Sequence, residues 1–175
     1  MHTVPSRPRP LAALLAGLLA LSPVLAVAAP HKKPPPPAPP KELGTYGAWV
    51  AATHGTGAAR ICYAFTRTDG QDPISGSGPV LSVTDRAGGR NQVAISAGPL
   101  YPKNAGVMVS VGTTKLDFYT SAHDAFARDG KATVEAFERG ATAVLHPPGK
   151  THPLSFSLKG FSAAHAAIRK ACPPK

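Results

Sequence analysis

Short runs in which apolar and polar residues alternate recur along the sequence from about residue 46 onward. In the run 107–111, three valines fall on one face, while Met108 and Ser110 fall on the other. Alternation with a period of two is the pattern of a half-buried β-strand. Comparable runs occupy residues 46–53, 59–66, 78–84, 92–96, 115–120, 140–146 and 154–158. The pattern therefore predicts a domain built mainly from short strands.

Clusters of turn-forming residues separate the predicted strands. Asp69-Gly70 and Pro102-Lys103-Asn104 are two of these clusters, and tight turns favour glycine, proline, aspartate and asparagine. Many short strands joined by such turns are typical of antiparallel sandwiches and small barrels. We therefore expect a mainly β fold, with a single antiparallel β-sandwich or small barrel domain.

Two stretches favour helix instead of strand. Residues 129–137 form the first, a short helix that Gly140 ends. The second runs from Ser162 to about Ala171, because serine is a good N-cap residue, the alanines favour helix and Pro173 stops it. The predicted domain therefore carries a C-terminal α-helix and one short extra helix.

Residues 1–28 have the layout of an export signal. Arg7 and Arg9 precede an apolar stretch, 11–27, and the small-x-small pattern at 26–28 is one that signal peptidase recognises. The alternative is an uncleaved membrane anchor, which needs about 20 apolar residues. The stretch is shorter than that and is broken by a proline near its end. We therefore predict a cleaved signal peptide, with no transmembrane segment after processing.

A proline-rich segment, 29–43, follows the predicted signal. Its central part, 30–41, holds seven prolines in twelve positions and no residue that could seed a core. Consecutive prolines favour an extended polyproline II conformation of about 3.1 Å per residue. The simpler interpretation is an extended linker; the alternative is a docking peptide whose lysines touch an anionic polymer or lipid. Residues 44–175 are then the folded domain.

The chain contains two cysteines, Cys62 and Cys172. Export places them in an oxidising compartment, where two cysteines in one chain permit one intramolecular disulfide. Their wide separation excludes the local C-x-x-C arrangement of a redox-active pair. We therefore predict a structural disulfide that joins the C-terminal helix to the strand at 59–66.

Positive charge is the main functional clue, because nineteen Lys and Arg stand against nine Asp and Glu. Net charge by itself indicates solubility and non-specific attraction, so a solubilising surface is the simpler interpretation. The more specific interpretation is a basic surface that binds lipopolysaccharide phosphates, anionic lipid or another protein. The candidate residues are Arg60, Arg67, Arg86 and Arg90. No strand has the interleaved aromatic and basic residues of an RNA-binding sheet, so we expect no nucleic acid partner.

No sequence motif indicates catalysis, a cofactor or a metal. His146 and His152 lie close in sequence, but no third ligand with metal spacing accompanies them, and zinc sites need three or four protein ligands. The metalloprotease and nucleophile-elbow motifs do not occur. A Ser–His–Asp triad assembled from distant positions stays open. We expect no enzyme activity, no catalytic residues, no cofactor and no metal.

An ordered set of short motifs resembles the invasion-associated locus B family of bacterial envelope proteins. In chain order they are GAW at 47–49, ICYA at 61–64, NQVAIS at 91–96, LDFYT at 116–120 and SLKGFSAA at 157–164. The resemblance covers residues 44–173, and Cys172 lies where such proteins place their second cysteine. It implies an exported, non-cytosolic domain, associated in some pathogens with host-cell invasion, and it implies no known catalytic residues.

Together these observations predict a non-catalytic protein of the cell envelope, periplasmic or secreted after signal-peptide cleavage. Its expected partner is an envelope or host-surface component. The alternative is a periplasmic hydrolase or an inhibitor of an envelope enzyme. A buried serine or histidine with a partner carboxylate in a concave pocket would favour the enzyme, whereas a basic or apolar surface patch without such a pocket would favour binding.

Overall fold

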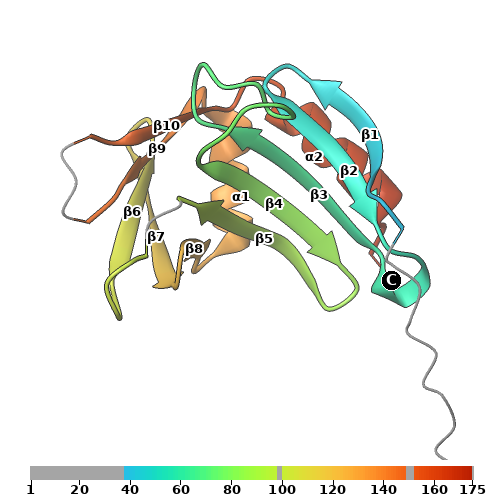
Figure 1. The fold of residues 1–175 in the computed structure, drawn as a ribbon, viewed down its shortest axis with the longest axis horizontal. Helices are drawn as coiled ribbons and strands as arrows, with labels where there is room; N and C mark the ends of the chain where they lie inside the picture. The colour runs from blue at the N-terminus through green and yellow to red at the C-terminus, as the bar shows by residue number, and fades with distance from the viewer. Residues whose placement is uncertain (1–37, 98–99, 149–151, 175) are drawn as a thin grey trace, which may run out of the picture. The chain divides into compact units, whose positions relative to one another are not determined.

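A computed structural model describes residues 38–97, 100–148 and 152–174 (Figure 1). The predicted signal peptide and most of the proline-rich segment lie outside the described residues. The strands are β1 Lys41–Tyr46, β2 Trp49–His54, β3 Ile61–Arg67, β4 Val80–Arg86, β5 Gly89–Ser96, β6 Gly106–Val111, β7 Thr114–Ser121, β8 Asp124–Ala127, β9 Thr142–His146 and β10 Leu154–Ser157. The helices are a 3-10 turn, Gly57–Ala59, and two α-helices, α1 Gly130–Arg139 and α2 Phe161–Ala171.

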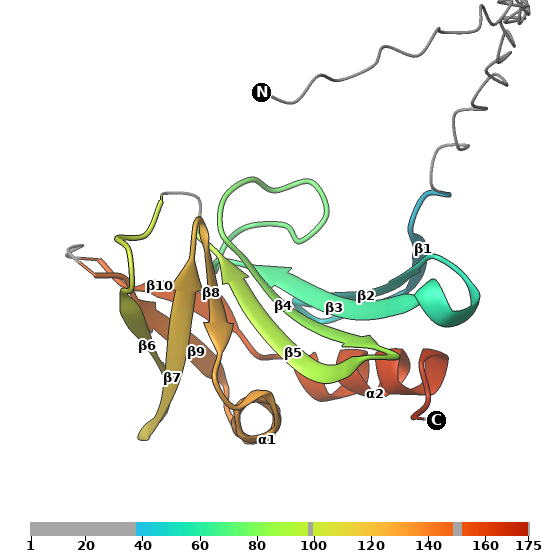
Figure 2. The same ribbon diagram turned by 90° about the horizontal axis from the view of Figure 1, so that it is seen from below.

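All ten strands belong to one antiparallel sheet, in the order β1-β2-β3-β4-β5-β8-β7-β6-β9-β10. The two halves of this sheet turn toward each other, and both α-helices lie on the same side of it (Figure 2). The expected mainly β class, with a C-terminal helix and one further helix, is confirmed. The sheet is curled but not a closed barrel, because β1 and β10 remain its two edges.

The curled sheet comes close to closing where β10 meets the β2–β3 pair. Trp49 Nε1 donates a hydrogen bond of 2.9 Å to the Ser157 carbonyl, and Thr68 forms an isolated antiparallel bridge with Phe156. Beyond this point β10 leads into α2, which packs on β1, β2 and β3. Helix α2 therefore fills the side of the domain that the sheet leaves open.

The core lies between the inner face of the sheet, which faces the helices, and the helices themselves. Alternate residues of β3 and β4 are buried, as the alternating pattern predicts. Phe161, the first residue of α2, is fully buried, and its ring lies 4.8 Å from that of Trp49 and 5.5 Å from that of Phe137 in α1. Losing such a ring costs about 3–5 kcal/mol. Phe161 therefore ties both helices to the sheet.

Helix α1 begins as the sequence predicts, because the Asp129 side chain accepts a hydrogen bond of 2.9 Å from the Ala132 N–H. The prediction that Ser162 caps α2 is wrong. The N-cap is Gly160, with φ 92°, and the helix begins at Phe161. A side chain at Gly160 would collide with the Tyr46 carbonyl. Only glycine adopts this left-handed conformation without strain where two backbone segments come so close.

The sequence analysis missed β1 and β8. The run predicted as one strand, 46–53, contains the turn of the β1–β2 hairpin, with Gly47 at φ 59°. Strand β1 also includes residues 41–43, which the sequence analysis placed in the linker. None of the described helices is both long and apolar enough to cross a membrane.

Candidate functional site: a basic groove beside the disulfide

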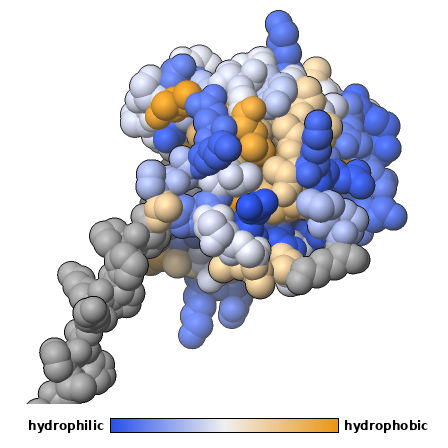
Figure 3. All heavy atoms as spheres, turned by 90° about the vertical axis from the view of Figure 1, so that its right-hand side faces the viewer, coloured by the Kyte–Doolittle hydropathy of each residue, from blue (hydrophilic) through white to orange (hydrophobic). Residues whose placement is uncertain are grey.

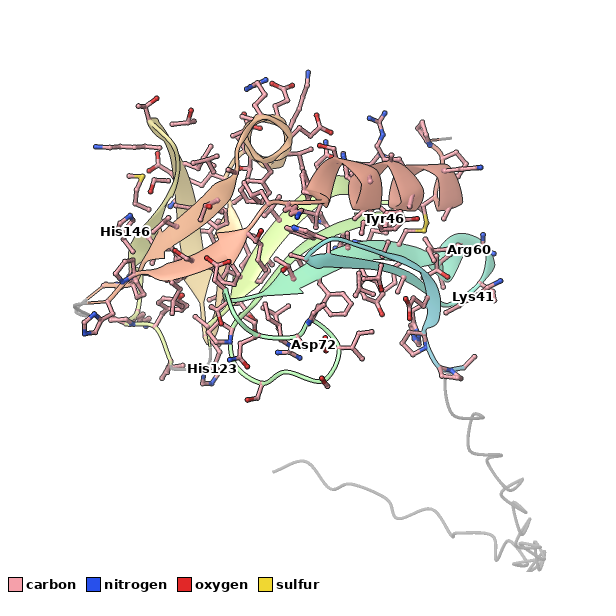
Figure 4. The ribbon with its side chains drawn as sticks, turned by 90° about the horizontal axis from the view of Figure 1, so that it is seen from above. Lys41, Tyr46, Arg60, Asp72, His123 and His146 are labelled. Carbon is pink, nitrogen blue, oxygen red and sulfur yellow. A yellow bond between two sulfur atoms is a disulfide. The ribbon has the colours of Figure 1, made fainter. Side chains whose placement is uncertain are left out.

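The predicted disulfide is present and defines one end of the domain. Cys62, fully buried in β3, is bonded to Cys172, which directly follows α2, with a Cα–Cα distance of 6.0 Å. In Figure 4 the sulfur atoms lie between α2 and the strands beneath it. The bond therefore joins the last helix to β3, as the sequence predicts.

A buried aspartate next to the disulfide holds one of the candidate arginines. Asp85 lies directly across from Cys62 in the β3–β4 pair and is 0% exposed. Its Oδ2 lies 2.7 Å from Nη2 of Arg90, whose Nη1 donates a hydrogen bond of 2.7 Å to the Cys172 carbonyl. The Arg90 side chain is still 30% exposed. Its guanidinium is therefore fixed in position but remains accessible from outside.

An irregularity in the β4–β5 hairpin accompanies this arrangement. The pairing register shifts between Thr84 and Arg86, and Asn91 has a φ of 53°. Asparagine is one of the few residues other than glycine that adopt this conformation readily. The Asn91 N–H donates to Asp85 Oδ1 at 2.8 Å, and its Oδ1 lies 3.3 Å from His165 Nε2. The irregular backbone thus supports the Asp85–Arg90 pair.

Three of the four candidate arginines, Arg60, Arg86 and Arg90, line one hollow of about 490 Å³, here called the arginine hollow. The pairing of Ile61 with Arg86 places the first two at the same end of the sheet. Small residues, prolines and Cys172 complete the lining, and none of these described residues carries a side-chain carboxylate. Neither Arg60 nor Arg86 forms a salt bridge with a described residue. On this side of the molecule, strongly hydrophilic side chains lie among small, weakly apolar ones (Figure 3).

A second hollow of about 590 Å³, here called the aromatic hollow, adjoins the first and shares Arg86 and Arg90 with it. The two hollows together are called the basic groove. It extends to Tyr119 of β7 and Phe126 of β8, whose stacked rings lie 5.4 Å apart. Strand β8 is short and pairs with β5 only at residues 94–96. The first half of β5 therefore has no strand beside it on that side, and the hollow lies there.

The fourth candidate, Arg67, lies at the opposite end of β3 from Arg60 and does not line the groove. Its Nε donates to the Pro73 carbonyl at 3.2 Å, and its Nη1 donates to the Gly78 carbonyl at 3.0 Å. Arg67 thus fixes the loop between β3 and β4. Figure 4 shows Arg60 near the disulfide and Asp72, in that loop, well apart from it.

The same loop is held by Asp72. Hydrogen bonds from the Ser75 N–H and hydroxyl and from the Ile74 N–H keep the pKa of the Asp72 carboxyl below its ordinary value, and the charge of Arg67 acts in the same direction. Stabilising contacts to the ionised form favour that form. The charges at this end of β3 are therefore engaged within the protein.

One histidine meets the pattern that would favour an enzyme. His165 is buried, and its Nδ1 lies 3.0 Å from Glu138 Oε1 beside a hollow of about 290 Å³. Its other ring nitrogen faces the amide oxygen of Asn91 instead of a hydroxyl or thiol. Among the described residues, no group of three His, Cys, Asp or Glu side chains is placed to hold a metal ion. The His165 cluster therefore serves to join α1, α2 and β5.

Sequence reasoning missed Asp85, Asn91, Tyr119 and Phe126. Two of them leave a signal in the alternating pattern. Asp85 follows Leu81 and Val83 on the core face of its strand, and Tyr119 falls on the polar face of the 115–120 run. An acidic residue in a core position and an aromatic residue in an exposed one are both informative. Asn91 and Phe126 carry no comparable signal.

The fold that carries this groove is therefore an open, curled antiparallel sheet with two helices on one side.

No family model matches the sequence, and no curated protein matches it. Among solved structures, the crystal structure of invasion-associated protein B from Bartonella henselae is similar, with a TM-score of 0.54 and 18% sequence identity. The similarity covers 74% of this chain and 96% of that chain. At this level of identity the likeness shows a shared fold.

Proposed function

We propose that this chain is an exported, non-catalytic protein of the cell envelope that binds an anionic component through the basic groove. The observation that carries the proposal is the arginine hollow, which Arg60, Arg86 and Arg90 line together with no acidic side chain among its described lining residues. Guanidinium groups bind phosphate and carboxylate through paired, charge-assisted hydrogen bonds. Such a surface is suited to an anion that carries several oxygen acceptors.

The three arginines contribute differently. The charge of Arg90 is balanced by Asp85, so Arg90 contributes a fixed hydrogen-bond donor more than a net charge. The net positive charge of the hollow comes from Arg60 and Arg86, which are exposed. Attraction to exposed charges is screened over about 8 Å at physiological ionic strength. Binding through this groove is therefore expected to be salt-dependent.

Export is supported by two independent features. The first 28 residues have the layout of a signal peptide, and a structural disulfide is compatible with an oxidising compartment. The similar solved structure is that of an invasion-associated protein. N-terminal sequencing of the mature protein should begin at Ala29 or within a residue or two of it. A membrane-bound protein that retains residues 1–28 would contradict processing.

The binding proposal is tested with vesicles that contain lipopolysaccharide. At low ionic strength, where the Debye length is about 30 Å, the protein should sediment with the vesicles and be released as salt rises. The double variant Arg60→Ala/Arg86→Ala should lose most of this binding. Lys115→Ala/Arg139→Ala removes the same formal charge from exposed positions outside the groove and is the control. Binding that both variants weaken equally, or that salt does not affect, would contradict the proposal.

A further inference from the structure

We infer that the anionic ligand is a phosphorylated saccharide, which lies along both hollows with a phosphate at the arginines and its sugar on the aromatic pair. This inference rests on the proposed function and narrows it to one class of ligand. The starting observation is that the two hollows adjoin. Arg86 and Arg90 line both of them, so guanidinium groups, which suit phosphate, lie where the hollows meet.

The strand register places several side chains of the aromatic hollow on the outer face of the sheet, opposite the core, while Gly130 and Lys131 of α1 line it from the side where β8 stops. Thr84 is paired with Gln92, Ala94 with Phe126, and Phe126 in turn with Tyr119. These side chains form adjoining cross-strand rows on one face. The row that begins with Arg86 is the next one toward the disulfide. A ligand that lies across the strands therefore passes from the arginines to the aromatic rings.

The side chains of the aromatic hollow suit a sugar. Tyr119 is 44% exposed and is one of the few large apolar side chains on the described surface. An aromatic ring offers an apolar surface to the C–H face of a sugar, and burial of that face is favourable. Thr84, Asn91 and Gln92 line the same hollow and offer a hydroxyl and two amides to sugar hydroxyls. The small side chain of Ala94 leaves the space between them open.

Further cations lie at or near the aromatic hollow. Arg128 does not line the hollow, but its guanidinium carbon lies 5.7 Å from the centre of the Tyr119 ring. At the side of the groove, Lys131 lines the aromatic hollow, and its Nζ is 4.0 Å from Glu135 on the exposed surface of α1. An exposed pair at that distance contributes little and leaves the lysine available to a ligand. A saccharide that carries a phosphate at each end matches this distribution of charge.

The dimensions agree with a ligand of this kind. Each hollow, about 490 and about 590 Å³, lies within the roughly 300–1,000 Å³ of ordinary small-molecule sites. A disaccharide therefore extends from one hollow into the other, whereas a single phosphate occupies only the arginine hollow. The aromatic contacts should add affinity only for ligands that contain the sugar.

The test measures binding of three probes by calorimetry at low salt. The probes are a glucosamine disaccharide with one phosphate at each end, the same disaccharide without phosphate, and inorganic pyrophosphate. We expect the phosphorylated disaccharide to bind at least about tenfold more tightly than either of the other two, since about 1.4 kcal/mol of contact to the sugar gives that factor. Uridine diphosphate serves as a fourth probe, because a planar base could also stack on the aromatic pair.

Two variants separate the contributions of the hollows. Tyr119→Ala should weaken binding of the phosphorylated disaccharide about tenfold and leave pyrophosphate binding unchanged. Because Tyr119 is partly exposed but stacks on Phe126, this variant should melt slightly below the natural chain and remain folded under the conditions of the assay. Arg86→Ala should weaken binding of both probes. Ile74→Ala removes another exposed apolar side chain, far from the groove, and is the matched control.

The outcomes distinguish the two proposals. Equal affinity for pyrophosphate and the phosphorylated disaccharide, with no effect of Tyr119→Ala, would overturn the saccharide inference and leave anion binding intact. Tighter binding of uridine diphosphate would also overturn it, in favour of a nucleotide ligand. No binding of any phosphate-bearing probe, or binding that Arg86→Ala does not change, would overturn the proposed function itself.

Discussion

The two ends of strand β3 use their arginines in opposite ways. At one end, Arg67 donates to two carbonyls of the β3–β4 loop and becomes part of the framework. At the other end, Arg90 has the same kind of internal partners, whereas Arg60 and Arg86 face a hollow without a salt bridge to any described residue. The contrast shows that the arginines with internal partners, Arg67 and Arg90, are partly buried and stabilise the framework, whereas Arg60 and Arg86 are exposed and available to a ligand.

The largest expected loss of stability comes from removing the Cys62–Cys172 disulfide, which joins α2 to β3. In the chain-entropy model, a disulfide that closes a loop of this length contributes about 4–5 kcal/mol, a large share of the roughly 5–15 kcal/mol that stabilises a domain. Cys62→Ser/Cys172→Ser should therefore lower the melting temperature by many degrees. Hydrogen exchange should show α2 opening before the β3–β4–β5 strands. An unchanged melting temperature in this variant would contradict the anchoring role.

A smaller loss is expected when Arg90 loses its buried partner. Asp85→Ala leaves a partly buried guanidinium and the Asn91 N–H without their acceptor. Since hydrogen bonds to charged groups are worth about 1.5–3 kcal/mol, and Arg90 is partly exposed, we expect a loss of about 2–3 kcal/mol. Urea denaturation measures this free energy. Asp117→Ala, at an exposed position of β7, should stay within about 0.5 kcal/mol of the natural chain.

The smallest expected changes in stability test the contrast between the two ends of β3 most directly. Arg67→Ala should cost about 1 kcal/mol of stability, because its carbonyl partners can still be solvated by water, and should leave anion binding unchanged. Arg86→Ala should weaken anion binding and change stability by no more than about 0.5 kcal/mol. Thermal melts and vesicle sedimentation on the same two proteins check both expectations. If both variants lose binding, or both lose only stability, then Arg67 and Arg86 do not differ in role as described.

The sequence predicts those parts of the fold that depend on local pattern. The strand at 107–111 and the short helix that begins near residue 129 both follow from local sequence pattern, and both are present in the structure. Strand β1 could not be found in this way, since the sequence Lys41–Tyr46 has no clear alternation and owes its conformation to pairing with β2. The cap at Gly160 depends on the approach of the Tyr46 carbonyl from another part of the chain.

The sequence likewise predicts only part of the basic groove, because the rest depends on contacts between distant residues. The basic composition pointed to Arg60, Arg86 and Arg90, but it could not separate them from Arg67, because that distinction depends on which carbonyls lie nearby in space. Nor does the sequence reveal that the short β8 leaves one side of β5 without a strand. The cavity arises from where the pairing stops, and strand pairing is a property of the whole sheet.

The near-closure of the sheet also has a consequence for how the chain reaches its fold. The hydrogen bond from Trp49 to Ser157 and the disulfide join residues 108 and 110 positions apart. Contacts between such distant residues raise the contact order and slow folding, because the chain entropy of a long loop is lost before the contact stabilises anything. The hairpins from β1 to β5 are local and can form before the rest of the chain folds. The Cys62 thiol can be bonded only when the last helix is in place, so the core face of the first five strands stays open until α2 packs on it.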